Sequence, residues 1–164
     1  MTGSIVGVNI SRGGVPKRPI EEGFLGPLGI EGDVHAHPQI HGGPLKAVLL
    51  ICSEAIAELA AKGYPIYQGA LGENLTLLGI DHRQLRSGQR YRVGQAVIEL
   101  TKIRVPCNTL DVYGPAIKSE IYDLEVKAGN TRSPKWARSG FYAAVVQTGV
   151  IRRDDIIALV DQVV

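Results

Sequence analysis

Turn-forming residues are spread along the whole chain, and this distribution limits the possible folds more than any other feature. Twenty glycines and nine prolines occur in 164 residues, and they do not gather into a linker. Glycine and proline interrupt helices and occupy turns, so this even spacing favours short strands joined by many turns. We therefore expect a β-rich fold rather than a helical one.

Apolar and alternating stretches between these turns predict the strands. Residues 4–11 alternate, whereas the run that ends at Cys52 is continuously apolar and typical of a strand buried on both faces. Gly94–Gln95 predicts a hairpin turn, and Pro106 ends the strand that follows it. A loop rich in glycine and proline is expected from Glu22 to Pro44. The predicted strands are 4–11, 46–52, 75–78, 90–93, 96–104, 141–147 and 156–160.

Two helices are predicted between these strands. Ser53 is the expected N-cap of a helix over Glu54–Lys62 that stops at Gly63, and Ala116–Lys127 is an amphipathic stretch. Strands outnumber helices and do not alternate with them regularly. This order excludes a doubly wound α/β sheet and favours a mainly β fold, a barrel with a few peripheral helices, in one domain over residues 1–164.

Composition excludes several classes of function. A net charge of +2, 5% aromatic residues and no dense basic stripe argue against a nucleic-acid partner. The longest apolar run, Ala47–Cys52, is too short to span a membrane, and no basic residue precedes an apolar stretch at the N-terminus. Two cysteines do not make a secreted disulfide framework. We expect a cytoplasmic protein with reduced thiols and no membrane partner.

Cys107 is the candidate reactive group. It follows Pro106, where the backbone is expected to leave the sheet, so its thiol can face a cavity at the barrel mouth. Arg104 lies three residues earlier, and a nearby cation favours thiolate, a soft metal ligand and sulfur carrier. The alternative for Cys107 is a buried structural cysteine. Cys52, between an apolar strand and a helix start, is expected to be buried.

The densest polar stretch is Asp33–Lys46. His35, His37 and His41 could bind a metal together, although no further ligand follows at zinc-finger spacing. The alternative is an anion-binding loop in which the backbone of Gly42–Gly43 and the Lys46 charge bind a phosphate.

Two further segments carry polar groups. In Gly72–Glu73–Asn74 the side chains either contact a ligand or only support the turn, and for the motif alone the turn is favoured. The segment Arg132–Gly140, which includes Arg138, is either a clamp for a phosphate or pterin ring or a solvated basic loop anchored by Trp136.

Taken in order, these segments resemble the MOSC domain, named for the C-terminal domain of molybdenum cofactor sulfurases. The resemblance spans nearly the whole chain and lies in the set rather than in any single motif. Its elements are Leu28–Asp33, His41–Val48, Gly72–Leu75, Val97–Thr101 running into Arg104–Cys107, Phe141–Ala143 and Gly149–Asp155.

The resemblance implies a β-barrel that binds the molybdenum cofactor (molybdopterin) and, as in stand-alone members, an oxidoreductase that reduces N-hydroxylated compounds. By position, Cys107 would be the metal ligand and catalytic group. His41, Gly42, Gly43, Lys46, Asn74, Arg104 and Arg138 would contact the cofactor, while Asp33 and Glu73 would hold loops in place. The chain lacks the additional domains of larger members, so electrons would come from an external donor protein, and the substrate would be a small molecule.

Two departures from the common pattern leave alternatives open. The His35–Ala36–His37 stretch allows a separate metal, and Asp154–Asp155 stands where the last turn usually has Gly-Asp, although Asp154 tolerates a turn conformation. The competing functions are a sulfur carrier or cofactor-transfer module with a Cys107 persulfide, and a metalloenzyme built on the three histidines. The choice between molybdenum and tungsten, the substrate and the oligomeric state are left open by the sequence.

Overall fold

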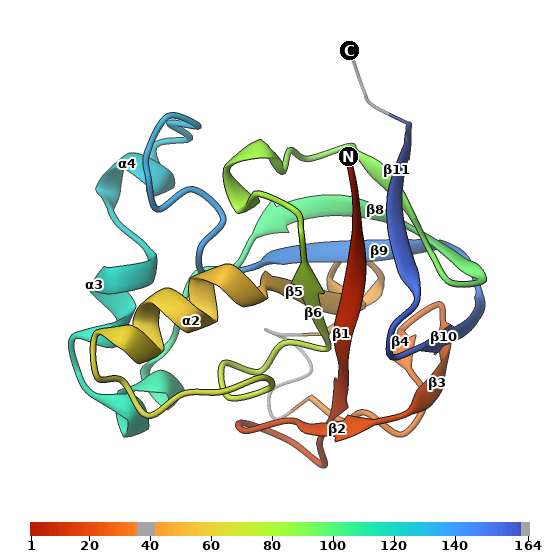
Figure 1. The fold of residues 1–164 in the computed structure, drawn as a ribbon, viewed down its shortest axis with the longest axis horizontal. Helices are drawn as coiled ribbons and strands as arrows, with labels where there is room; N and C mark the ends of the chain where they lie inside the picture. The colour runs from red at the N-terminus through yellow and green to blue at the C-terminus, as the bar shows by residue number, and fades with distance from the viewer. Residues whose placement is uncertain (36–41, 162–164) are drawn as a thin grey trace.

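A closed barrel forms the body of the molecule (Figure 1). The computed structural model describes residues 1–35 and 42–161, and within these ranges seven strands hydrogen-bond in the order β11–β7–β8–β9–β5–β6–β1, after which β1 pairs with β11. In this ring β5 and β6 are parallel and the other neighbours antiparallel. The prediction of a mainly β barrel is confirmed. The barrel strands are β1 (Thr2–Ile10), β5 (Val48–Cys52), β6 (Leu75–Leu78), β7 (Arg90–Val93), β8 (Ala96–Ile103), β9 (Phe141–Gln147) and β11 (Ile156–Asp161).

The prediction of a loop from Glu22 to Pro44 is wrong for part of that segment, which forms strands. Its first part forms β3 (Glu22–Gly26) and β4 (Gly29–Ile30), which make a separate sheet with β10 (Gly149–Arg152), and β2 (Arg18–Ile20) extends β1. The sequence near residue 25 does not reveal β3, because its partner β10 lies more than a hundred residues away in the chain. Gly29 has φ 126°, and a Cβ there would lie 2.5 Å from the Ala47 carbonyl oxygen, so this close approach requires glycine.

The two helices predicted from the sequence are confirmed only in part. α2 (Ser53–Ala61) is present, but Cys52 and not Ser53 occupies its N-cap, and the helix ends before Gly63, which has φ 97°. The predicted helix 116–127 is divided into α3 (Ile117–Ile121) and α4 (Leu124–Lys127). The break occurs because the Asp123 carboxylate accepts a hydrogen bond from Val126 N (2.9 Å), which starts a new helix. The part of the chain that the structure describes also contains the 3₁₀ helices η1 (Pro44–Lys46), η2 (His82–Gln84) and η3 (Asn108–Tyr113).

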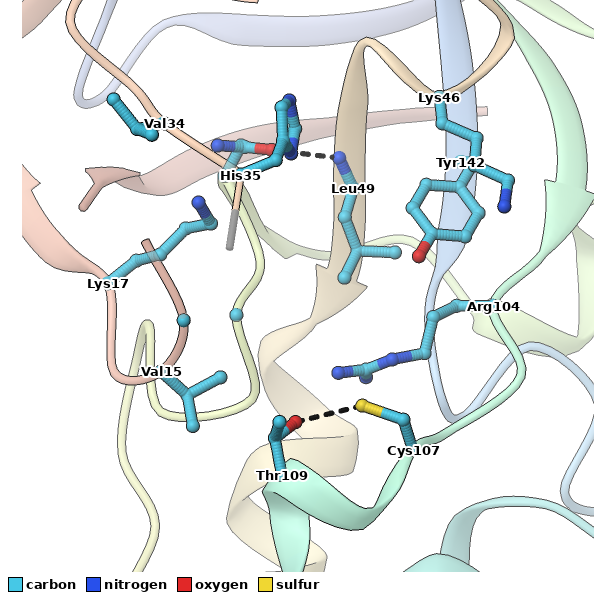
Figure 2. Close-up of a pocket in the computed structure, with 13 residues that line it drawn as sticks. Val15, Lys17, Val34, His35, Lys46, Leu49, Arg104, Cys107, Thr109 and Tyr142 are labelled. Atoms are coloured by element: carbon cyan, nitrogen blue, oxygen red, sulfur yellow. Dashed lines mark hydrogen bonds between the residues drawn. The ribbon is translucent and has the colours of Figure 1, made fainter. Parts of the chain in front are cut away.

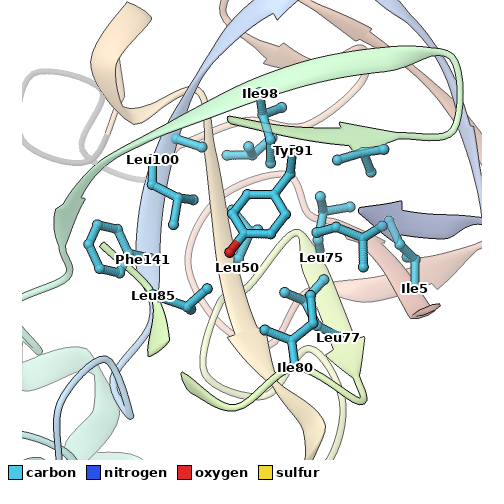
Figure 3. Close-up of a cluster of buried hydrophobic side chains, with 14 of the residues drawn as sticks. Ile5, Leu50, Leu75, Leu77, Ile80, Leu85, Tyr91, Ile98, Leu100 and Phe141 are labelled. Atoms are coloured by element: carbon cyan, nitrogen blue, oxygen red, sulfur yellow. The ribbon is translucent and has the colours of Figure 1, made fainter. Parts of the chain in front are cut away.

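The inside of the barrel is filled mainly by aliphatic side chains, together with aromatic ones such as Tyr91 and Phe141 (Figure 3). Tyr91 is buried, and its hydroxyl donates to Gln89 Oε1 at 3.0 Å. Cys52 belongs to this core, which confirms the prediction that it is buried, and burial raises the pKa of its thiol far above the ordinary value. A second apolar cluster packs α2 and α3 against the barrel wall. The barrel therefore has a solid core, and a ligand must bind at its end or surface.

The first and last strands, β1 and β11, meet where the barrel closes. Thr2, Gly3 and Ser4 pair with residues 158 to 156, and Asp154 turns the chain into β11 with φ 74°, the turn conformation expected for it. Within the described ranges, no helix combines the length and apolar character that crossing a bilayer needs.

Candidate functional site

A pocket opens where β5 begins and β8 ends, and Cys107 lies in its wall (Figure 2). The cavity itself is small, about 80 Å³, and it opens to solvent. The lining residues are Gly14, Val15, Lys17, Val34, His35, Lys46, Leu49, Gly72, Asn74, Arg104, Cys107, Thr109 and Tyr142.

Cys107 reaches this pocket because the chain leaves the sheet just before it. Arg104 N still donates to Gly140 O at 2.9 Å, and Pro106 then ends the pairing with β9. Cys107 is extended (φ −114°, ψ 174°) and forms the N-cap of η3. Its thiol is partly exposed and lies 2.8 Å from Thr109 Oγ1, in a hydrogen bond that either atom can donate. The sulfur is thus accessible to a ligand instead of being packed in the core.

Arg104 is a buried cation directly behind the thiol. Its guanidinium donates to Ser139 O (3.0 Å) and Leu71 O (2.5 Å), and Ser139 Oγ donates in return to Arg104 O. Burial lowers the pKa of Arg104, while the charges of Tyr142, Cys107 and Glu73 oppose this effect. In residues 1–35 and 42–161 no carboxylate lies within ion-pair distance of it. An anion in the pocket would therefore compensate a charge that is costly to bury.

Lys46 supplies a second cation on the same side of the pocket. It ends η1, and its Nζ lies 5.2 Å from the centre of the Tyr142 ring, a cation–π contact. Burial lowers the pKa of the Lys46 ammonium, and the nearby charge of Lys102 lowers it further. Gly42 and Gly43 precede η1, and Gly43 has φ 99°, but in the described part of the chain neither glycine lines the pocket.

Asn74 borders the pocket, but its side-chain amide is engaged by the protein. Its Oδ1 accepts from Leu49 N (3.0 Å), and its Nδ2 donates to Asn9 O (3.2 Å) and Asp33 Oδ2 (2.9 Å). Asp33 also accepts from Lys17 Nζ at 2.6 Å in a buried ion pair. These contacts give Asn74 a supporting position in the wall, and they give Asp33 the loop-holding position expected for it.

Arg138 does not reach the Cys107 pocket. It lines a second hollow, where it donates to Glu58 Oε2 (2.9 Å) and Glu120 O (3.3 Å). Trp136 is nearly buried, and its Nε1 donates to Leu85 O at 2.8 Å. The segment Arg132–Gly140 is therefore anchored by Trp136, as the alternative reading held, and it does not form a clamp beside Cys107. Its contribution to the site is indirect, through the contacts of Ser139 with Arg104.

Of the three histidines predicted as a metal site, His35 lies in the described part of the chain. His35 lines the pocket, whereas His37 and His41 lie outside the described residues. Over residues 1–35 and 42–161, no group of three His, Cys, Asp or Glu side chains is placed to hold a metal ion. His82, the remaining histidine, is buried, and its ring hydrogen-bonds the Trp136 carbonyl.

Several residues of the pocket wall were not predicted from the sequence. Thr109 could have been suspected because it lies two residues after Cys107, where a 3₁₀ turn brings side chains together. Tyr142 and Val15 carry no such local signal: Tyr142 reaches the pocket because β9 pairs with the end of β8, and Val15 comes from the loop after β1.

Comparisons with known proteins agree with this description. The model of the MOSC domain family matches residues 37–158. The chain is 31% identical over 140 residues to the uncharacterized protein YflK of Bacillus subtilis and 29% identical over 144 residues to the protein YiiM of Escherichia coli. These alignments cover 83% and 85% of this chain but only 58% and 60% of the two relatives, so the chain spans about three fifths of their length.

Solved structures show the same fold. The crystal structure of YiiM from Geobacillus stearothermophilus superposes with a TM-score of 0.74 at 26% identity, covering 97% of this chain and 75% of that one. The YUAD protein of Bacillus subtilis superposes with a TM-score of 0.71 at 20% identity, covering 96% and 94%.

Proposed function

The chain belongs to the MOSC domain family, and from this premise we propose that its pocket binds the molybdenum cofactor with the Cys107 thiolate as a ligand of the metal. The family is associated with this cofactor. The observation that carries the proposal is the position of the Cys107 sulfur: it is accessible, at the wall of a pocket, and adjacent to a buried cation without a carboxylate partner in the described chain.

The side chains around the pocket fit a molybdenum cofactor. Thiolate is a soft ligand suited to molybdenum in a sulfur-rich environment. The cofactor carries negative charge on its phosphate and its sulfur atoms, and Arg104 and Lys46 would offset that charge on one side of the pocket. Arg104 is held in place by two carbonyl oxygens, so it needs no rearrangement to do this. Thr109 Oγ1 is within hydrogen-bond distance of the sulfur and would donate to it in the thiolate form.

We propose that the reaction is the reduction of an N-hydroxylated compound. The N–O bond breaks as two electrons and two protons are added, R–NHOH + 2e⁻ + 2H⁺ → R–NH₂ + H₂O, with the electrons coming from an external redox protein and the protons from solvent. When bound, the cofactor supplies the two-electron redox couple for this step. The protein binds the cofactor, orients the substrate and limits access of water.

The test is elemental analysis of protein produced in a host that makes the cofactor. We expect wild-type protein to contain stoichiometric molybdenum, or tungsten if that metal is used, and Cys107→Ala to lose it at least on the order of tenfold, because a ligand of the metal is removed. Cys52→Ala is the matched control, since it removes the other thiol from the core and should keep the metal. Stoichiometric metal in Cys107→Ala would exclude the ligand assignment.

The same preparations separate the competing functions. A sulfur adduct on Cys107 in the intact mass, together with no reductase activity in molybdenum-loaded protein, would favour a sulfur carrier. Zinc or iron that persists in Cys107→Ala and disappears when His35, His37 and His41 are replaced together would favour a histidine metal site.

A further inference from the structure

The pocket has two unlike walls (Figure 2). Cys107, Arg104, Lys46 and Tyr142 form one of them. The opposite wall comes from the loop after β1 and from the segment after β4, and it presents the side chains of Val15 and Val34. Buried Leu49 lies between the two walls. The first wall therefore carries the sulfur and the cations, and the second offers mainly hydrocarbon surface.

The apolar wall carries no net charge, although two ionisable side chains belong to it. The Lys17 ammonium is paired with the Asp33 carboxylate at 2.6 Å, and the exposed fractions of the two side chains are 8% and 2%, so their charges cancel away from water. Burial lowers the pKa of His35, an effect that the Asp33 carboxylate opposes and the Lys17 charge strengthens, and the shift favours the neutral imidazole. Neither group offers an ion pair to a ligand.

The space in front of this wall is open. Val15 is only partly buried, and among residues 1–35 and 42–161 no atom lies within 4 Å of a Cβ added at Gly14. Gly72 is a neighbour of Val15 in the pocket lining, since a Cβ added at Gly72 would lie 3.2 Å from Val15 Cγ1. The wall therefore exposes apolar surface to a ligand at the mouth of the pocket.

We propose that this pocket selects N-hydroxylated substrates with an uncharged, apolar body, which rests on Val15 and Val34 while the N–O group faces Cys107. The inference rests on the proposed function and names the substrate class of the same site. The physical reason for this selectivity is charge. Arg104 and Lys46 would compensate the charge of the anionic cofactor, so a carboxylate on the substrate would lose its hydration without gaining a partner.

The test compares two probes of nearly the same shape, phenylhydroxylamine and 4-(hydroxyamino)benzoate. Calorimetry on molybdenum-loaded protein without an electron donor measures binding, and turnover with reduced methyl viologen measures kcat/KM. We expect the neutral probe to bind more tightly, and to have the higher kcat/KM, by on the order of tenfold or more. Equal values, or a preference for the carboxylate probe, would overturn the proposal.

Substitution of the wall tests which residues are responsible. Val15→Asp should weaken binding of phenylhydroxylamine by on the order of tenfold, and the nearly isosteric Val15→Thr should weaken it less, while the molybdenum content of both variants stays at the wild-type level. Val146→Asp is the matched control, because Val146 is exposed and does not line the pocket. Unchanged binding in both Val15 variants would contradict the proposal. Selective binding without any turnover would leave it standing and refute the proposed reductase function instead.

Discussion

Burial shifts the protonation of Glu73 into the neutral pH range. It is fully buried next to Asn74, and within the described chain its Oε1 has no hydrogen-bond partner, while Oε2 accepts from Thr76 Oγ1 at 3.2 Å. Burial raises the pKa of Glu73 from 4.5 to about 7, although backbone hydrogen bonds, Thr76 and the charge of Arg104 oppose the shift. At neutral pH the carboxyl group is therefore close to the midpoint of its titration.

This residue makes the stability depend on pH. Between pH 4.5 and 7 the folded chain keeps a proton that the unfolded chain has lost, so the free energy of unfolding falls as the pH rises through this window. The full loss is about 3 kcal/mol above pH 7. We expect Glu73→Gln to lack this contribution, which urea unfolding of both proteins at pH 5 and pH 8 would measure. The same pH slope in both proteins would mean that Glu73 does not titrate as described.

At the scale of elements, the pocket wall is assembled from segments distant in the sequence. Asp33, which follows β4, contacts Lys17 of the loop after β1 and Asn74 of the turn before β6. Asn74 in turn binds Leu49 N at the start of β5. Three loops and a strand thus share one polar network, and its centre is a buried ion pair.

Removal of one charge from the Lys17–Asp33 pair should lower the free energy of unfolding substantially. We expect Asp33→Asn to lower the free energy of unfolding by about 3 kcal/mol, because the Lys17 ammonium would be left buried without its partner. The loss in the double variant Asp33→Asn/Lys17→Met should be smaller than the sum of the two single losses, as measured by denaturant unfolding. Glu22→Gln breaks the exposed pair with Arg152 and should cost less than about 1 kcal/mol. If Asp33→Asn cost no more than Glu22→Gln, the pair would not hold the wall.

At the scale of the whole molecule, β1 and β11 close the barrel through a short contact. Three residue pairs join them, and hydrogen bonds from Ile5 N to Asp155 O (2.8 Å) and from Asp154 N to Ile5 O (2.7 Å) continue the seam. The closure removes the free edges of the barrel, whereas the three-residue β2 stays at an edge of the sheet.

We expect the barrel to open as one cooperative unit. Native-state hydrogen exchange should give the paired amides of β1 and β11 the same opening free energy as those of β8 and β9, and the amides of β2 should exchange on the order of a hundredfold faster. Exchange in β11 as fast as in β2 would show that the seam opens independently of the barrel.

The sequence by itself determined the features that depend on neighbouring residues. Even spacing of glycine and proline predicted a β fold, the apolar run before Cys52 predicted a buried strand, and Pro106 predicted the point where the chain leaves the sheet before Cys107. The ordered motifs were sufficient to indicate the MOSC family, which the family model also matches.

Only the tertiary structure decided which residues meet. β3 escaped prediction because it pairs with β10 at the other end of the chain, and the helix predicted over Ala116–Lys127 is divided because Asp123 caps a new start. Arg104 and Arg138 were both predicted to contact the cofactor, but only Arg104 lies behind the Cys107 thiol. Arg138 pairs with Glu58 instead. Val15 and Tyr142 face each other across the pocket because β5 and β6 join β9 to β1 in the sheet. Local sequence sets the conformation of a segment, whereas contacts between distant segments depend on strand pairing and burial of the whole chain.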